Sequence, residues 1–203
     1  MRLVVAITGA SGAIYGIRIL QMLSALGVER HLVASKHALL TLKAETDWSP
    51  DQVRALATEV HPAGDIGATI ASGSFRHDGM IIAPCSVKTL SGVANCYADN
   101  LVTRAADVTL KERRRLVLVF RETPLHLGHL RLLTQAAEMG ATVFPPVPAF
   151  YHRPKIIDDI VDQTAGRVLD QFGLDAAVAR WEGIGPARPA WPDPLLPADR
   201  SPR

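Results

Sequence analysis

The chain has 203 residues, of which 48% are hydrophobic and 21% are charged, and its formal net charge is +2. This length suits one domain that buries about two-thirds of its unfolded surface. The small net charge gives no indication of a nucleic-acid partner, and no apolar run reaches the roughly 20 residues that span a bilayer, so we expect neither nucleic acid nor membrane as a partner.

Short apolar runs alternate with helical stretches, which predicts βαβ units and a mainly parallel sheet, hence an α/β fold. Strands are expected at 2–8, 30–35, 79–84, 115–121 and 141–145. Helices are expected at 13–26, 36–43, 50–58, 65–71, 88–95, 99–112, 125–139 and 155–172.

The two ends of the chain differ in character. The first residues enter an apolar strand directly, without the basic region and cleavage site of a signal peptide. Cys85 and Cys96 are too few for a disulfide framework, so we expect free thiols and a cytoplasmic location. After Trp181 proline becomes too frequent for helix or sheet. We therefore expect one domain over 1–182 and an extended or disordered tail over 183–203.

A glycine-rich turn, Thr8 to Ala13, joins the first strand to the first helix. Glycines permit close approach of a ligand to the backbone, and the helix N-terminus offers free N–H groups to a phosphate. The second strand ends in Ser35-Lys36 rather than in an acidic ribose ligand, which favours a mononucleotide over a dinucleotide. A tight turn without a ligand is the alternative interpretation.

A second polar loop follows the third expected strand and runs from Ser86 to Thr89. Ligands of doubly wound sheets bind outside the carboxyl ends of the strands, so two such loops support one binding site. Helix capping by Ser86 or Thr89 is the simpler interpretation, and the two are compatible.

Cations and a carboxylate suggest a phosphate-bearing substrate. The fourth expected strand ends in Arg121-Glu122, where arginine can clamp a phosphate and the carboxylate can move a proton. A structural ion pair between the two is the alternative interpretation. Arg104 and Lys111 lie seven residues apart on one expected helix, although on their own they are explained more simply by a solvated helix face. A rigid proline-rich segment at 145–154 presents Tyr151. No metal site is expected, because His126 and His129 have no matching carboxylate cluster.

Taken together, these motifs resemble the UbiX-like flavin prenyltransferases over about residues 2–182. The motifs that carry the resemblance are Thr8–Ala13, Glu45–Asp47, Ala71–Ser74, Pro84–Ser86, Arg104–Val108, Leu110–Arg114, Arg121–Pro124 and Phe150–His152. The resemblance implies a three-layer, Rossmann-like (flavodoxin-like) domain assembled into a dodecamer, with active sites where subunits meet. It also implies metal-free transfer of a dimethylallyl unit from dimethylallyl phosphate to N5 and C6 of reduced FMN. The product, prenylated FMN, would serve UbiD-type decarboxylases, which in many bacteria act in ubiquinone synthesis.

The resemblance also implies a role for each matching residue. FMN-binding positions are Gly9, Ala10, Ser11, Ser35, Ser86, Val87, Lys88, Thr89 and Arg121. Positions that hold the prenyl phosphate are Tyr151 and Arg167, with Arg104, Lys111 and Glu122 in the same pocket and Trp181 near it. Positions linked to the chemistry are Ser11, Glu45, Glu122, Lys111 and Arg104.

Two other functions fit some of these residues. Flavin-dependent cysteine decarboxylases share the expected fold but carry a Pro-x-Met-Asn-x-x-Met-Trp segment, where this chain has Pro84-Cys85-Ser86-Val87-Lys88-Thr89-Leu90. A non-catalytic FMN carrier would use the same loops and leave the cationic residues unexplained. The identity of the recipient decarboxylase, the choice of monophosphate or diphosphate donor and the role of the tail are left open by the sequence.

Overall fold

The computed structural model of the chain describes residues 1–183, so the expected tail lies outside the described residues apart from Gly183. The strands are β1 (Arg2–Ile7), β2 (Glu29–Ala34), β3 (Glu59–Pro62), β4 (Gly79–Cys85), β5 (Arg115–Phe120) and β6 (Thr142–Val143). The helices are α1 (Ala13–Ala25), α2 (Lys36–Glu45), α3 (Pro50–Ala55), η1 (Thr69–Ala71), α4 (Val87–Ala94), α5 (Leu101–Lys111), α6 (Leu127–Glu138) and α7 (Ile157–Asp170).

The strands form one parallel sheet in the order β3-β2-β1-β4-β5-β6, which confirms the α/β prediction. This order is that of doubly wound Rossmann folds. The five strands expected from the sequence, taken without β3, have the flavodoxin order 2-1-3-4-5, so both descriptions apply. The order reverses between β1 and β4, and ligands of such sheets bind at the carboxyl ends of the strands there.

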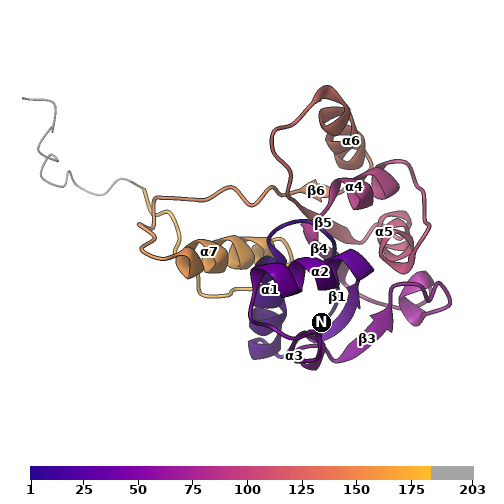
Figure 1. Cartoon of the computed structure of the whole chain (residues 1–203), viewed down its shortest axis with the longest axis horizontal. Helices are drawn as coiled ribbons and strands as arrows, with labels where there is room; N and C mark the ends of the chain where they lie inside the picture. The colour runs from indigo at the N-terminus through magenta and orange to yellow at the C-terminus, as the bar shows by residue number, and fades with distance from the viewer. Residues whose placement is uncertain (184–203) are drawn as a thin grey trace, which may run out of the picture.

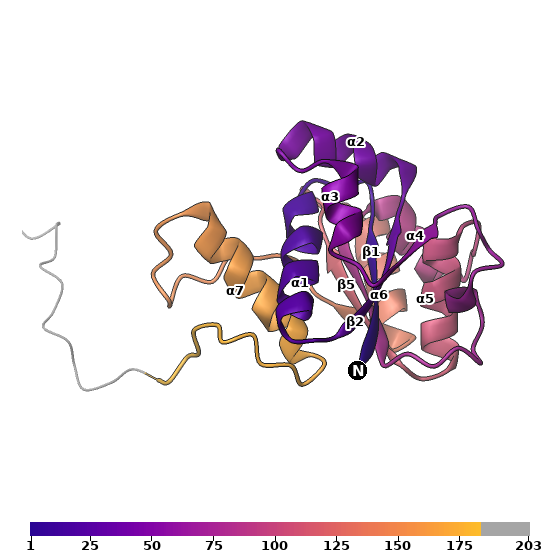
Figure 2. The same ribbon diagram turned by 90° about the horizontal axis from the view of Figure 1, so that it is seen from below.

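Helices cover both faces of the sheet and give it three layers (Figures 1 and 2). One core lies under α1, α2, α3 and α7, and the other lies under α4, α5 and α6. The central strands are apolar on both faces and β4 is buried at every residue, as expected for a parallel sheet covered on two sides. No helix within residues 1–183 combines the length and hydrophobicity that crossing a membrane requires.

Two local predictions were wrong. β3, a four-residue edge strand of which only His61 is buried, was not predicted. The helix expected at 65–71 is a turn followed by the short η1, because the Asp65 carboxylate accepts a hydrogen bond from the Gly67 N–H (3.0 Å). Such local side-chain bonds compete with helix formation, and glycine weakens a helix further.

Candidate active site

The glycine turn lies at the carboxyl end of β1 and packs closely against α2. A Cβ atom on Gly9 would lie 2.3 Å from the Cβ of His37, so only glycine fits at this contact. Gly12 has a φ of 99°, a left-handed conformation that glycine adopts without strain. The turn therefore has the shape that the sequence predicts.

Thr8 ties this turn to the loop after β4. Its hydroxyl donates to the Pro84 carbonyl oxygen (2.6 Å) and accepts a hydrogen bond from the Ser86 N–H (2.9 Å). Thr8 is almost fully buried, and its bond to Pro84 is shielded from water. The relative position of the two loops thus depends on a side chain that sequence reasoning did not single out.

Serine hydroxyls cap the helices that border the site. Ser35 accepts a hydrogen bond from the Ala38 N–H at the start of α2 (3.1 Å), and Ser86 accepts one from the Thr89 N–H at the start of α4 (3.3 Å). The capping interpretation is therefore confirmed for Ser86. A capping hydroxyl still has a lone pair to offer a ligand, so the capping role leaves binding possible.

These loops enclose a cleft of about 510 Å³ at the switch point of the sheet. Its volume lies within the range of about 300–1,000 Å³ typical of small-molecule sites. All nine residues predicted to bind the cofactor line it, namely Gly9, Ala10, Ser11, Ser35, Ser86, Val87, Lys88, Thr89 and Arg121. Glu122 lines it as well. His37, Asn100 and Val102 also line it and were not predicted.

The cleft offers a cation for an anionic group. Lys88 is paired with Asp99 (Nζ to Oδ2, 3.2 Å), whereas Arg121 has no ion pair within residues 1–183. Burial raises the pKa of the neighbouring Tyr15, and the positive charge of Arg121 opposes that rise. Arg121 is therefore available to a phosphate.

Glu45 occupies part of the helix N-terminus that was predicted to bind a phosphate. Its carboxylate accepts hydrogen bonds from the N–H groups of Gly12 (2.8 Å) and Ala13 (3.2 Å) at the start of α1. The sequence predicted that this helix N-terminus would offer its N–H groups to a phosphate, and two of them are already paired. A carboxylate there is stabilised by the helix dipole.

Arg104 and Lys111 lie on α5, outside the residues that line the cleft. The Arg104 guanidinium pairs with Asp107 (2.8 Å) and donates to the Ala71 carbonyl oxygen (3.1 Å). Lys111 pairs with Glu112 (2.5 Å) beside Gly73. Both cations are half-exposed, so they are accessible from outside the chain.

Tyr151, Arg167 and Trp181 form a separate group around α7, which packs on α1 at the other face of the sheet (Figure 1). The Tyr151 hydroxyl accepts a hydrogen bond from Gln163 (2.5 Å), and its ring meets that of Trp181 edge to face at 5.8 Å. Arg167 pairs with Asp170 and is half-exposed. Within one chain, the structure therefore separates Tyr151, Arg167 and Trp181 from Arg104 and Lys111, and none of the five lines the cleft.

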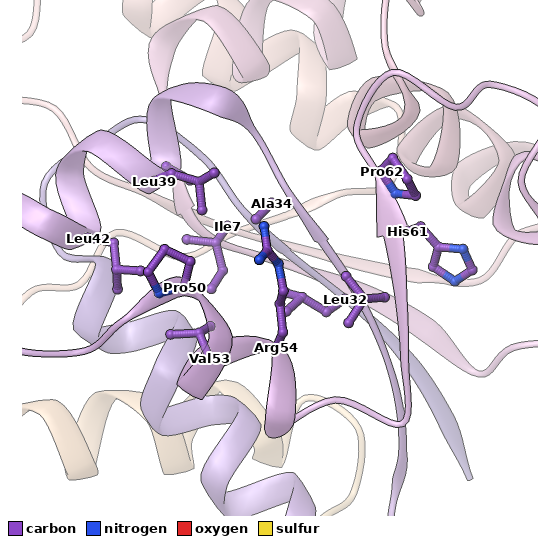
Figure 3. Close-up of a pocket in the computed structure, with 12 residues that line it drawn as sticks. Ile7, Leu32, Ala34, Leu39, Leu42, Pro50, Val53, Arg54, His61 and Pro62 are labelled. Carbon is purple, nitrogen blue, oxygen red and sulfur yellow. The ribbon is translucent and has the colours of Figure 1, made fainter.

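A second cavity, of about 200 Å³, lies between α2, α3 and the β2–β3 edge (Figure 3). Its lining is almost entirely aliphatic, with the Arg54 guanidinium as its one charged group within the described chain. Figure 3 shows the His61 ring directed away from the aliphatic side chains. The cavity contains none of the predicted site residues and lacks hydroxyl groups for a phosphate, so we assign the site to the larger cleft.

The fold and the cleft define an α/β flavoprotein, and comparisons with known proteins agree. The sequence model of the Flavoprotein family matches residues 1–169. The chain is 64% identical to the flavin prenyltransferase UbiX of Thauera aromatica, over 90% of this chain and 95% of that protein. It is 61% identical to the UbiX of Escherichia coli K12, over 90% and 98%.

Solved structures give the same result. The crystal structure of AnUbiX (PadA1) with FMN and dimethylallyl pyrophosphate superposes with a TM-score of 0.89 at 54% identity, covering 90% of this chain and 98% of that one. A dodecameric FMN-dependent UbiX-like decarboxylase from Escherichia coli O157:H7 superposes at 0.88 with 52% identity, covering 90% and 100%. The chain belongs to the UbiX flavin prenyltransferase family.

Proposed function

We propose that this protein transfers the dimethylallyl unit of dimethylallyl phosphate to N5 and C6 of reduced FMN and releases phosphate. The observation that carries the proposal is the cleft in which all nine predicted FMN-binding residues meet. Membership of the flavin prenyltransferase family supports the same reaction.

The cleft fits FMN by shape and chemistry. Backbone close to the cleft surface at Gly9 and Ala10 suits a flat ring, and the Ser35, Ser86 and Thr89 hydroxyls suit polar edges. Arg121 suits the phosphate because it can form two parallel charge-assisted hydrogen bonds. When bound, reduced FMN supplies the nucleophilic nitrogen and carbon of the reaction.

The chain's own residues then supply electrostatics and proton transfer. Arg104, Lys111 and Arg167 stabilise the departing phosphate, and one well-placed donor of this kind is worth about 3 kcal/mol. Tyr151 and Trp181 shield the prenyl group from water. Glu122, inside the cleft, accepts the proton lost at C6, while Glu45 holds the glycine turn through two N–H groups.

Because α5 and α7 lie on opposite faces of the sheet, we propose that neighbouring subunits complete the site in a dodecamer like that of the Escherichia coli relative. Exposed apolar side chains on two segments support assembly, namely Leu127 and Leu130 on α6 and Phe150 in the proline-rich segment. Further proposals are a UbiD-type decarboxylase as recipient of the product and a cytoplasmic location, which suits the free thiols of Cys85 and Cys96.

The test is a mass spectrum of the flavin after incubation of the protein with reduced FMN and dimethylallyl phosphate, with the diphosphate tested in parallel. A mass gain of one prenyl unit supports the proposal and identifies the donor. An unchanged flavin with both donors contradicts it and favours a carrier or a decarboxylase.

The variants Arg167→Ala and Lys111→Ala should retain FMN affinity while losing turnover, because neither residue lines the FMN cleft. Lys43→Ala, at an exposed position on α2, is the matched control and should leave both quantities unchanged. Full turnover in both active-site variants would show that Arg167 and Lys111 take no part in the reaction.

A further inference from the structure

A cluster of histidines and glutamates joins the edge strands β2 and β3. In the parallel register, His31 lies opposite Glu59, and Val33 lies opposite His61. Side chains two residues apart point to the same face of a sheet, so His31, Glu59 and His61 share one face. Both histidines are buried, whereas the Glu59 side chain is 52% exposed.

The potential ligand atoms of these three residues face one another. His31 Nδ1 lies 2.9 Å from His61 Nε2 and 3.5 Å from Glu59 Oε2. His61 Nε2 lies 3.7 Å from Glu59 Oε1. Around a tetrahedral ion with bonds of about 2.0–2.2 Å, neighbouring ligand atoms are roughly 3.3 Å apart. The observed separations lie on both sides of that value.

A second carboxylate fixes the orientation of the His31 ring. Glu29 Oε1 lies 3.0 Å from His31 Nε2, and the Arg2 Nε donates to the same carboxylate oxygen at 2.7 Å. The His31 Nε2–H therefore donates to Glu29, which leaves a lone pair on Nδ1, the atom directed at His61 and Glu59. A carboxylate behind a histidine in this way is typical of metal-ligating histidines.

The surroundings suit a bound ion that stays apart from the flavin cleft. Phe75 packs edge to face against the His31 ring at 5.1 Å and shields it from one side, while the half-exposed Glu59 leaves a path for the ion and for a water ligand. None of Glu29, His31, Glu59 and His61 lines the cleft.

We propose that His31 Nδ1, His61 Nε2 and the Glu59 carboxylate bind a divalent transition-metal ion of the Zn²⁺ type, with water as the fourth ligand. Without the ion, the His61 Nε2–H donates to His31 Nδ1, as the 2.9 Å separation indicates. With the ion, the His61 ring carries its proton on its own Nδ1 instead of Nε2, and the two rings separate by a few tenths of an ångström. The ion then links β3, the edge strand, to β2.

The experiment uses the full chain, saturated with FMN and treated with a chelator. Zn²⁺ binding is measured by titration calorimetry and by metal analysis after dialysis, and Co²⁺ is added as a spectroscopic probe of tetrahedral coordination. The wild-type protein should retain one Zn²⁺ per chain and give the visible spectrum of tetrahedral Co²⁺. A wild-type protein that retains no Zn²⁺ would overturn the proposal and leave the two histidines sharing only a proton.

Variants separate this site from other surface ligands. Glu59→Gln should weaken Zn²⁺ binding at least tenfold, and Glu29→Gln should weaken it 10- to 100-fold, as is typical when the partner of a ligating histidine is lost. Glu138→Gln, at an exposed position on α6, is the control and should bind as the wild type does. His61→Gln should abolish the Co²⁺ spectrum.

If His61→Gln does not fold, the half-exposed Glu59 still provides a test, since its replacement should spare the fold. FMN affinity should be unchanged in Glu59→Gln, which separates the ion site from the proposed enzymatic function. Equal Zn²⁺ affinity in the wild type, Glu59→Gln and Glu29→Gln would refute the assignment of the ligands.

Discussion

Replacement of Thr8 by valine tests whether one buried hydroxyl holds the two loops of the cleft together. Valine has nearly the same shape, so the change removes two hydrogen bonds and little volume. The Ser86 N–H would lose its partner, and the Pro84 carbonyl would keep only its bond from the Thr8 N–H (3.3 Å). A buried unsatisfied group costs about 1–3 kcal/mol, so we expect a loss of roughly 2–3 kcal/mol in the free energy of unfolding.

That loss is smaller than the roughly 5–15 kcal/mol of a typical domain, so the variant should fold. Urea unfolding of the FMN-free protein should show a lower midpoint at an unchanged slope. Because the loops are no longer tied, FMN titration should show affinity lowered about tenfold, which corresponds to about 1.4 kcal/mol.

The matched control is Thr134→Val, at an exposed position on α6 where the hydroxyl donates to the Leu130 carbonyl oxygen (3.0 Å). It should change stability by no more than about 0.5 kcal/mol. If Thr8→Val unfolds at the same urea concentration as the control and binds FMN equally well, the loops are positioned by something other than Thr8.

Three further predictions follow from packing and burial. Gly16→Ala should destabilise the fold by about 1–3 kcal/mol in thermal or urea unfolding, because the new Cβ would lie 2.3 Å from a backbone oxygen of β4. Gly64→Ala is the control and should be near neutral, because the space around Gly64 is open. Iodoacetamide should label the exposed Cys96 and spare Cys85 in the folded protein, because burial raises the pKa of the Cys85 thiol; equal labelling in a mass spectrum would contradict the buried position. Burial lowers the pKa of His77, so its contribution to stability is complete above its unfolded pKa of about 6.5 and is lost as the pH falls through the lower folded value. His77→Gln should therefore reduce the fall in unfolding free energy between neutral and acidic pH, and an unchanged pH profile would show that His77 is not the responsible group.

The sequence predicted the parts of the fold that repeat a strong local pattern. Strands β1, β2, β4 and β5 are apolar runs bounded by helical periodicity, and each was expected within one or two residues of its observed position. β3 was missed because an edge strand of four residues, three of them exposed, carries no alternating pattern. The sequence therefore predicted a parallel sheet of five strands, and the sixth strand and the strand order come from the structure.

The candidate site was predicted where its residues follow a strand, since the carboxyl ends of parallel strands meet at one edge. Contributions that depend on packing were missed. Thr8 acts through a contact with Ser86, 78 positions away, and Glu45 reaches Gly12 across 33 positions. No local motif encodes such contacts, and the same holds for His31 and His61, which meet only because the unexpected β3 pairs with β2.

Within one chain, Tyr151 and Arg167 do not line the cleft, so a neighbouring subunit has to bring them to it. A structure of the assembled protein, solved by crystallography or electron microscopy with FMN and dimethylallyl phosphate bound, tests the central claim most directly. We predict the flavin ring between the Ser11 and Ser86 loops, with Tyr151 and Arg167 from a neighbouring subunit at the prenyl phosphate. A flavin bound elsewhere, or a prenyl phosphate remote from both residues in every subunit, would contradict it.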